Sequence, residues 1–157
     1  MIKEFNSLEE IQKYYDEKSN TYVFKENGEY IDLIKLKFDL NVESNIDARD
    51  IEAHDIKAFD INARFINAHD IIRAYNIYAY MINANYVNSC DITSNFIYVN
   101  NLNASDIIGA TEIIADTIMY HEVCYAYRHI RCKHIEGIFR FSQHFVLDGV
   151  LEIENDK

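Results

Sequence analysis

The chain contains no proline, no tryptophan, four glycines and three cysteines among 157 residues. It has no glycine-rich phosphate loop, and the G-x-S-x-G and H-E-x-x-H motifs are also absent. Cys90, Cys124 and Cys132 are odd in number and lack the spacing of a disulfide framework, which favours reduced thiols. The sequence therefore predicts a protein that is not an enzyme and that uses no cofactor and no metal.

Basic residues are scarce, with 15 Lys and Arg against 26 Asp and Glu and a formal net charge of −11. A chain this acidic repels nucleic acid and anionic membranes, and it attracts basic surfaces. No apolar run approaches the roughly 18 residues that span a bilayer, and the first residues lack the apolar core of a signal peptide. We expect a cytoplasmic protein, and the length fits one domain.

What the chain has in abundance is a five-residue repeat, Ile-x-Ala-x-Asp, which is clearest in NIDARDIEAHDIKAFDINARFINAHDI, residues 45–71. One extra residue interrupts the repeat at Asp70-Ile71-Ile72, and another at Asp106-Ile107-Ile108. A helix repeats every 3.6 residues and a strand every two, so neither alone explains a period of five. About eighteen residues begin a unit: Ile46, Ile51, Ile56, Ile61, Ile66, Ile72, Ile77, Ile82, Val87, Ile92, Ile97, Leu102, Ile108, Ile113, Ile118, Val123, Ile130 and Ile135.

The repeat predicts a β-solenoid. The first and third residues of each unit point inward, the second and fourth point outward, and the fifth turns the corner. Stacked coils bury one another's isoleucines, each worth roughly 1.5–3 kcal/mol. A helix of Ile and Ala is excluded because a period of five precesses around a helix and leaves no apolar face.

This repeat resembles that of the pentapeptide-repeat proteins, over roughly Asn45 to Gly137. The resemblance implies an all-β, right-handed β-solenoid with a four-sided coil of four units. The stretches DINARFINAHDI, YAYRHIRCKHIEG and HFVLDGVLEI look like a group of uncharacterised phage and prophage proteins of low-GC bacteria. That second resemblance implies the cytoplasm of a bacterial host, and it carries no chemistry.

The flanks of the repeat differ from its middle. Ser7 and Glu10 form a capping-box pattern that predicts a short N-terminal helix. Asn27-Gly28 and Asp148-Gly149 predict hairpins that cap the two ends of the solenoid. We divide the chain into an N-terminal helix and strand cap (1–44), the solenoid (45–139) and a C-terminal hairpin cap (140–157).

Acids dominate the fifth position of the repeat. With four units per coil, every fourth such residue stacks, which gives a predicted binding column of Asp50, Asp70, Asp91 and Glu112. Carboxylates about 4.8 Å apart repel by ~1 kcal/mol per pair in water. The column could cap turns, imitate a phosphate strand or hold hard cations. Further acidic candidates are Asp55, Asp60, Asp106 and Glu122.

A second group of side chains raises the alternative of a zinc site. His121, Cys124, Cys132 and His134 could supply a Cys2His2 set, although H-x2-C and C-x-H are not the usual finger spacings. Cys132 falls at an inward position, where cysteine behaves as a small apolar residue.

Three functions remain open. DNA-mimicking pentapeptide-repeat proteins that bind type II topoisomerases resemble the first, an acidic inhibitor of a host protein with a basic nucleic-acid-binding surface. A topoisomerase, a restriction or CRISPR system, or another defence system is the expected class of partner, with no direct contact to nucleic acid or membrane. The alternative is a structural solenoid that self-associates, and a homodimer is possible in either case. The third is a small enzyme or metal protein.

Overall fold

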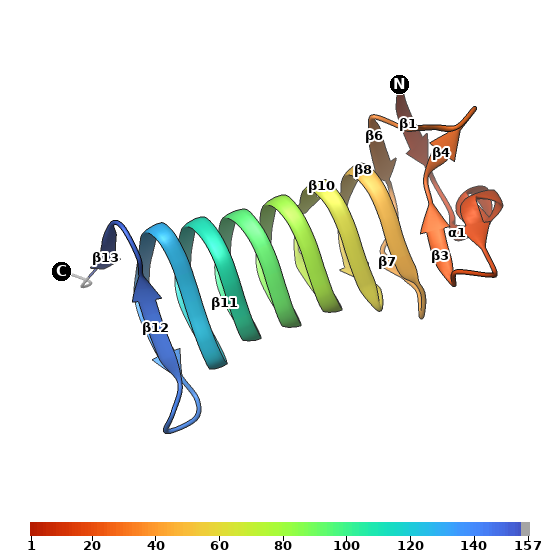
Figure 1. Cartoon of the computed structure of the whole chain (residues 1–157). Coiled ribbons are helices and arrows are strands. Elements are labelled where there is room, and N and C mark those ends of the chain that lie inside the picture. Colours follow the sequence, from red (N-terminus) through yellow and green to blue (C-terminus); the bar gives the residue numbers. More distant parts are fainter. Residues whose placement is uncertain (155–157) are drawn as a thin grey trace.

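The structure, a computed structural model, describes residues 1–154. The chain winds as a succession of parallel coils from α1 at one end to β13 at the other (Figure 1), and the predicted predominance of β-structure is confirmed. One helix, α1, spans Leu8–Ile11 and continues as a 3-10 turn, Gln12–Tyr14. The strands are β1 Ile2–Phe5, β2 Tyr15–Asp16, β3 Thr21–Val23, β4 Lys25–Glu26, β5 Glu29–Tyr30, β6 Leu33–Leu36, β7 Leu40–Asn41, β8 Asn45–Ala53, β9 Ile56–Lys57, β10 Asp60–Ala68, β11 Ile71–Gly137, β12 Gln143–Val146 and β13 Val150–Ile153.

Each coil contains three repeat units. Ile46 lies opposite Ile61, and the units that begin at Ile46, Ile51 and Ile56 fill the coil between them. Ile61 in turn lies opposite Ile77, and this next coil also takes in the first extra residue. A coil of four units would bring Ile46 opposite Ile66, but Ile66 lies opposite Ile51, so the predicted four-sided coil is wrong. The period of five sets the length of one side, whereas the number of sides depends on how sharply the corners turn.

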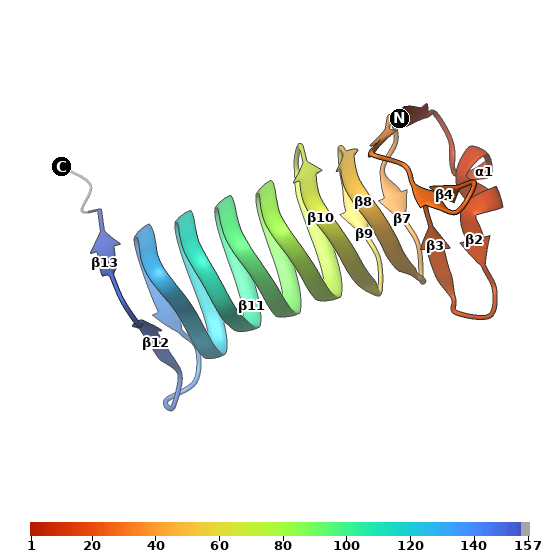
Figure 2. The same cartoon turned by 45° about the horizontal axis from the view of Figure 1, so that its top comes forward.

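The coils form one parallel wound sheet, with β8, β10 and the successive turns of β11 side by side (Figure 2). The first and third positions of most units point into this sheet, as predicted. The prediction is wrong for the units placed at Ile108 and Val123, where Ile107 is buried in place of Ile108, and Cys124 and Ala126 are buried in place of Val123 and Tyr125. In the first five units all of these residues are buried: Ile46, Ala48, Ile51, Ala53, Ile56, Ala58, Ile61, Ala63, Ile66 and Ala68. Because the register repeats, isoleucine stacks on isoleucine from coil to coil. Each buried isoleucine contributes about 1.5–3 kcal/mol.

The two extra residues are accommodated differently. At the first, Ile72 is fully buried and Ile71 is partly exposed. At the second, Ile107 is fully buried and Ile108 is 48% exposed. The inward first residue of this unit is therefore Ile107 and not Ile108. Gly109 follows with a φ of +78°, a left-handed conformation that glycine adopts without strain. The glycine therefore returns the chain to the repeat after the outward bulge.

The N-terminal segment begins with β1, which pairs in parallel with β6, so the predicted helix is short and does not open the chain. Ser7 occupies the N-cap of α1 without a side-chain capping bond. The Glu10 carboxylate accepts the N–H of Asn6 at 2.8 Å, so the predicted capping box is not formed. The predicted hairpin at Asn27-Gly28 is confirmed, since β4 and β5 are antiparallel and both turn residues have positive φ.

Aromatic side chains fill the interior of the N-terminal segment. Phe5, Tyr14 and Phe24 are buried. The ring centroids of Phe5 and Tyr14 lie 5.6 Å apart, and those of Tyr14 and Phe24 lie 5.2 Å apart. The first coil of the wound sheet thus adjoins a small aromatic core.

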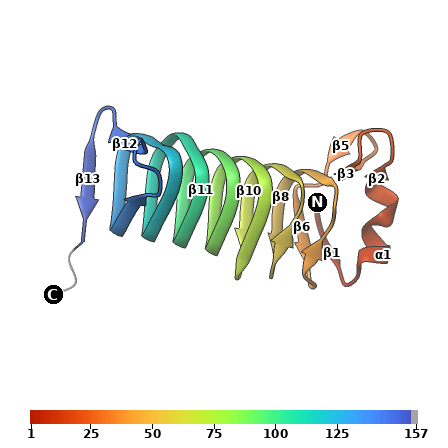
Figure 3. The ribbon, with the colours of Figure 1, turned by 90° about the horizontal axis from the view of Figure 1, so that it is seen from below.

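The C-terminal segment is not a hairpin. β12 pairs in parallel with Val123–Ala126 of β11, and β13 pairs in parallel with His129–Cys132 (Figure 3). A Cβ at Gly149 would lie 1.6 Å from the carbonyl oxygen of Arg128, and Gly149 is not a residue of positive φ. This glycine therefore permits a close approach of two backbones and makes no hairpin turn. The last three residues of the predicted cap, 155–157, lie outside the described part of the chain.

The inward assignment is tested by Ile92, which has no exposed surface. We expect Ile92→Asp to cost more than about 4 kcal/mol, because it buries an unpaired charge. Ile92→Val, the matched control, should cost only about 0.5–1.5 kcal/mol. Circular dichroism and thermal melting of both variants check this, and a normal melt for Ile92→Asp would show that the residue faces outward.

Candidate functional site

The predicted column of Asp50, Asp70, Asp91 and Glu112 does not exist. The residue opposite Asp50 is Phe65, and the residue opposite Phe65 is Met81. The backbone oxygen of Asp70 accepts the N–H of Tyr86, so Asp70 belongs to a different column from Asp50. The error follows from the number of units per coil, because the prediction stacked every fourth unit and the structure stacks every third.

Three corner aspartates bind the backbone of the next coil. The Oδ1 atom of Asp55 accepts the N–H of Ile71 at 3.0 Å, that of Asp60 accepts the N–H of Asn76 at 3.2 Å, and that of Asp106 accepts the N–H of Val123 at 3.0 Å. Each of these bonds crosses one of the two extra residues of the repeat. Each aspartate thus lies where a coil is longer than three units, and its carboxylate satisfies an amide. The turn-capping role considered for these acids is therefore present.

A different set of acids lies along one edge of the wound sheet. Asp60 lies opposite Asn76 in the register of β10 and β11. One surface groove is lined by Tyr75, Cys90, Ser105 and His121. Each of these directly precedes one of Asn76, Asp91, Asp106 and Glu122 in the sequence. The column therefore continues through Asp91 and Asp106. The N–H of Val123 binds Asp106, so Val123 takes the next position and Glu122 lies directly before it. We call Asp60, Asp91, Asp106 and Glu122 the acidic edge, which extends over about 19 Å at the spacing of neighbouring strands.

Asp91, Asp106 and Glu122 of the acidic edge lie in a part of the chain without basic residues, whereas Lys57 and Arg73 line the same groove near Asp60. Residues 74–127 contain no lysine and no arginine. The carboxylates of Asp91 and Glu122 take part in no ion pair within residues 1–154. Solvent and salt, and not an ion pair, therefore screen these two charges.

Acids elsewhere in the wound sheet are compensated by neighbouring groups. Arg64 binds Asp50 through two hydrogen bonds, from Nε at 3.0 Å and from Nη2 at 2.7 Å. Lys133 lies 3.1 Å from Asp116. Glu112 accepts the hydroxyl of Tyr98 at 2.8 Å, and burial together with this hydrogen bond raises the pKa of Tyr98 to about 12. These carboxylates have partners within the molecule, in contrast to Asp91 and Glu122.

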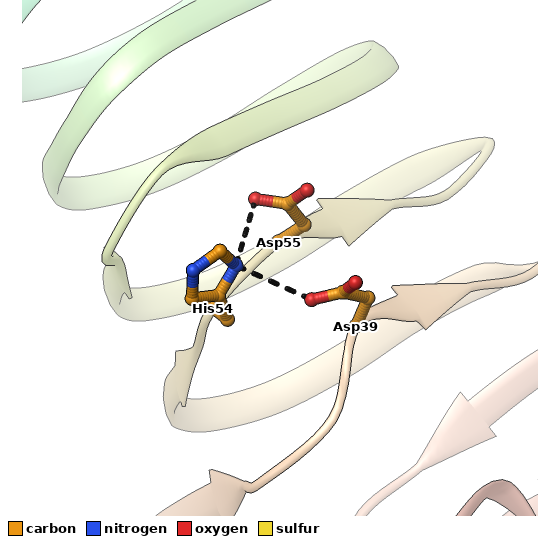
Figure 4. Close-up of side chains that lie close together, drawn as sticks. All are labelled: Asp39, His54 and Asp55. Atoms are coloured by element: carbon orange, nitrogen blue, oxygen red, sulfur yellow. Dashed lines mark ion pairs between the residues drawn. The ribbon is translucent and has the colours of Figure 1, made fainter.

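Asp39, His54 and Asp55 form a cluster that sequence reasoning missed (Figure 4). His54 Nδ1 lies 3.3 Å from Oδ1 of both aspartates. The pairing of Leu40 with Ile56 holds Asp39 beside Asp55, although Asp39 precedes the repeat. The three ligand atoms lie within 4.8 Å of one another and could hold a divalent cation. The ion pair alone accounts for this exposed arrangement, and we assign no metal to it.

The alternative zinc set is not assembled. Cys124 and Cys132 point inward and are buried, whereas His134 is exposed and lies 3.2 Å from Glu136. Burial, with a smaller contribution from the nearby Cys132, raises the pKa of Cys124 to about 12. A zinc ligand is a thiolate, so a thiol held in its protonated form is poorly suited to bind the metal.

Aromatic side chains flank the acidic edge on the outer surface. The rings of Phe59 and Tyr75 are stacked, with centroids 5.4 Å apart and planes 9° apart. Both residues occupy the fourth position of the repeat, directly before Asp60 and Asn76, and each is 54% exposed. The column of exposed aromatics is therefore continuous with the column of acids.

Comparison with known proteins finds no family, no curated protein and no solved structure that matches the chain. Within residues 1–154, no helix is long and apolar enough to cross a membrane.

The role of Asp60 as a backbone acceptor is tested by two substitutions. We expect Asp60→Ala to destabilise the fold by about 1–2 kcal/mol, because the amide of Asn76 loses its partner. Asp60→Asn keeps an acceptor oxygen and should cost less. Urea unfolding of the two variants measures the difference, and equal stabilities would contradict the role.

The buried thiol of Cys124 makes stability depend on pH. The pKa of Cys124 is about 12 in the folded chain, against an ordinary value of 9.0. The folded chain therefore keeps its proton where the unfolded chain loses it, so stability is lost as pH rises from about 9 through about 12. Cys124→Ala should weaken this dependence, as measured by urea unfolding at pH 8, 9 and 10. An unchanged dependence in the variant would assign it to tyrosines.

Proposed function

We propose that this protein is a non-enzymatic binding module that occupies the basic nucleic-acid-binding surface of a host protein. The acidic edge carries the proposal, because it places uncompensated carboxylates in one line on a rigid scaffold. It replaces the predicted column as the surface that imitates a phosphate strand. A topoisomerase, a restriction enzyme, a CRISPR nuclease or another defence protein has a surface of the required charge.

The rigidity of the scaffold supports this proposal. Asp60 and Asp106 are held by backbone amides of the next coil, at 3.2 Å and 3.0 Å. Fixed carboxylates lose little conformational freedom on binding, which favours association with a complementary basic surface. Their charges remain exposed to a partner because a hydrogen bond from an amide does not neutralise them.

The chemistry of the flanking surface also suits a protein partner. Stacked, half-exposed aromatic rings beside a charged edge are typical of a protein interface. The stack of Phe59 and Tyr75 lies on the side of the edge toward the N-terminus. We infer that the edge and this stack act together.

The scaffold itself is proposed to be a pentapeptide-repeat-type β-solenoid of right-handed coils. The inward Ile and Ala at a period of five and the parallel pairing of successive coils support this assignment. The coil differs from the four-sided form in having three units.

The proposal is tested by a fourfold variant of the acidic edge, Asp60→Asn, Asp91→Asn, Asp106→Asn and Glu122→Gln. The probes are DNA supercoiling by gyrase, DNA cleavage by a restriction enzyme and DNA cleavage by a CRISPR nuclease, each assayed at 50 and 300 mM salt. We expect the natural protein to inhibit at least one enzyme at low salt. Inhibition should weaken by at least ~10-fold at high salt and in the variant.

A matched control removes the same charge elsewhere. Glu9→Gln, Glu17→Gln, Glu29→Gln and Glu43→Gln alter four exposed acids of the N-terminal segment. This control should inhibit as the natural protein does. Equal inhibition by the edge variant would refute the role of the edge, and inhibition in none of the three assays would count against these classes of partner.

A further inference from the structure

Two basic side chains lie next to each other on the outer surface of the wound sheet. Lys57 of β9 lies directly opposite Arg73 of β11. Both are exposed, and within residues 1–154 neither side chain takes part in an ion pair or a hydrogen bond. Like charges directly opposite each other destabilise a sheet. In a chain of net charge −11 this pair is an unneutralised positive site, and an anion bound between the two side chains would remove their repulsion.

The basic pair lines a surface groove together with the aromatic stack. The groove has a volume of about 370 Å³ and is lined by Lys57, Arg73, Phe59 and Tyr75, among others. This volume falls within the range of small-molecule sites, roughly 300–1,000 Å³. Residues two apart in an extended chain lie about 7 Å from each other. Each cation therefore has an aromatic ring two positions further along its own coil.

The aromatic stack stops at Tyr75 and leaves room for another flat group. The hydroxyl of Ser89 donates to the backbone oxygen of Tyr75 at 3.0 Å, which places the small Cys90 in the coil after Tyr75. Ser105, also small, lines the groove beyond it. In the part of the chain that the structure describes, the ring of Tyr75 stacks on Phe59 alone. A planar ligand can therefore continue the stack above Cys90.

Polar side chains without partners line the same groove. Asn88 and Asn103 belong to its lining, and within residues 1–154 neither side-chain amide makes a hydrogen bond. An amide offers both donors and an acceptor, which match the edge of a nucleic-acid base. No Asp or Glu is found among the described residues that line the groove. The groove thus combines cations for a phosphate, a ring for stacking and amides for a polar ring edge.

We propose that this groove binds a mononucleotide, with its phosphate between Lys57 and Arg73 and its base stacked on Tyr75. Arginine binds two phosphate oxygens at once, and lysine supplies a point charge. One sugar separates the phosphate of a nucleotide from its base, which suits the spacing of the cations and the rings. Asp55 and Asp60 flank the site in the sequence and repel the further phosphates of a strand, which favours a free nucleotide. The inference does not depend on what the acidic edge binds.

The test is the binding of AMP to the full chain, by isothermal titration calorimetry at 50 mM salt. We expect a dissociation constant below about 1 mM. Adenosine lacks the phosphate and inorganic phosphate lacks the base, so each should bind at least ~10-fold more weakly. A short oligodeoxyadenylate should bind no more tightly than AMP, because the flanking carboxylates repel its additional phosphates.

Variants at exposed positions separate the two parts of the site. Lys57→Gln combined with Arg73→Gln should weaken AMP binding at least ~10-fold, and Tyr75→Leu should do the same by removing the stacking surface. The matched control for charge is Lys18→Gln combined with Arg140→Gln, two exposed basic residues outside the groove. The matched control for the ring is Tyr78→Leu, at 48% exposure. Both controls should bind AMP as the natural protein does.

Several outcomes would overturn the proposal. They are no binding of AMP up to about 1 mM, unchanged binding in the variant without the two cations, and equal binding of adenosine and AMP. Phenyl phosphate that binds as tightly as AMP would indicate a phosphotyrosine peptide, and a tighter oligodeoxyadenylate would indicate a strand. The fourfold variant of the acidic edge should bind AMP at least as tightly as the natural protein. Failure of this site and failure of the acidic edge are therefore distinguishable.

Discussion

Ile61 lies between Ile46 and Ile77 in three successive coils, and this stacking of like on like is the contact on which the rest of the molecule depends. It requires that a fixed number of residues separates one coil from the next. Parallel pairing then continues along the wound sheet because each coil repeats the geometry of the previous one. Alanine at the third position keeps the walls close enough for the isoleucines to meet.

A coil that contains one residue too many threatens this arrangement, and the chain has a local remedy. The extra residue leaves an amide out of step with the ladder, and an unpaired buried amide is costly. Asp55, Asp60 and Asp106 each accept such an amide from the following coil. The acids that were expected to serve binding therefore serve the fold first. Asp60 and Asp106 also belong to the acidic edge, and their charge remains available for a partner.

Sequence reasoning identified the inward residues because the alternation of Ile and Ala at a period of five is a local property. It could not supply the number of units per coil, since three and four units share the same local pattern and differ only in the corner angle. The error carried over to the candidate site, where Asp50 proved to lie opposite Phe65. The glycine at Gly149 was misread because close backbone approach and positive φ both call for glycine. The cluster around His54 was missed because Asp39 lies outside the repeat.

The wound sheet places each coil in contact only with the coils on either side of it, so its cooperativity is one-dimensional. Stability in such an arrangement is a sum over neighbouring layers, and unfolding advances from an end. The N-terminal end is closed by the aromatic core of Phe5, Tyr14 and Phe24, whereas the last described layer at the other end has a single neighbour. Within residues 1–154, we therefore expect unfolding to begin at β13 and to advance toward β8, one layer at a time.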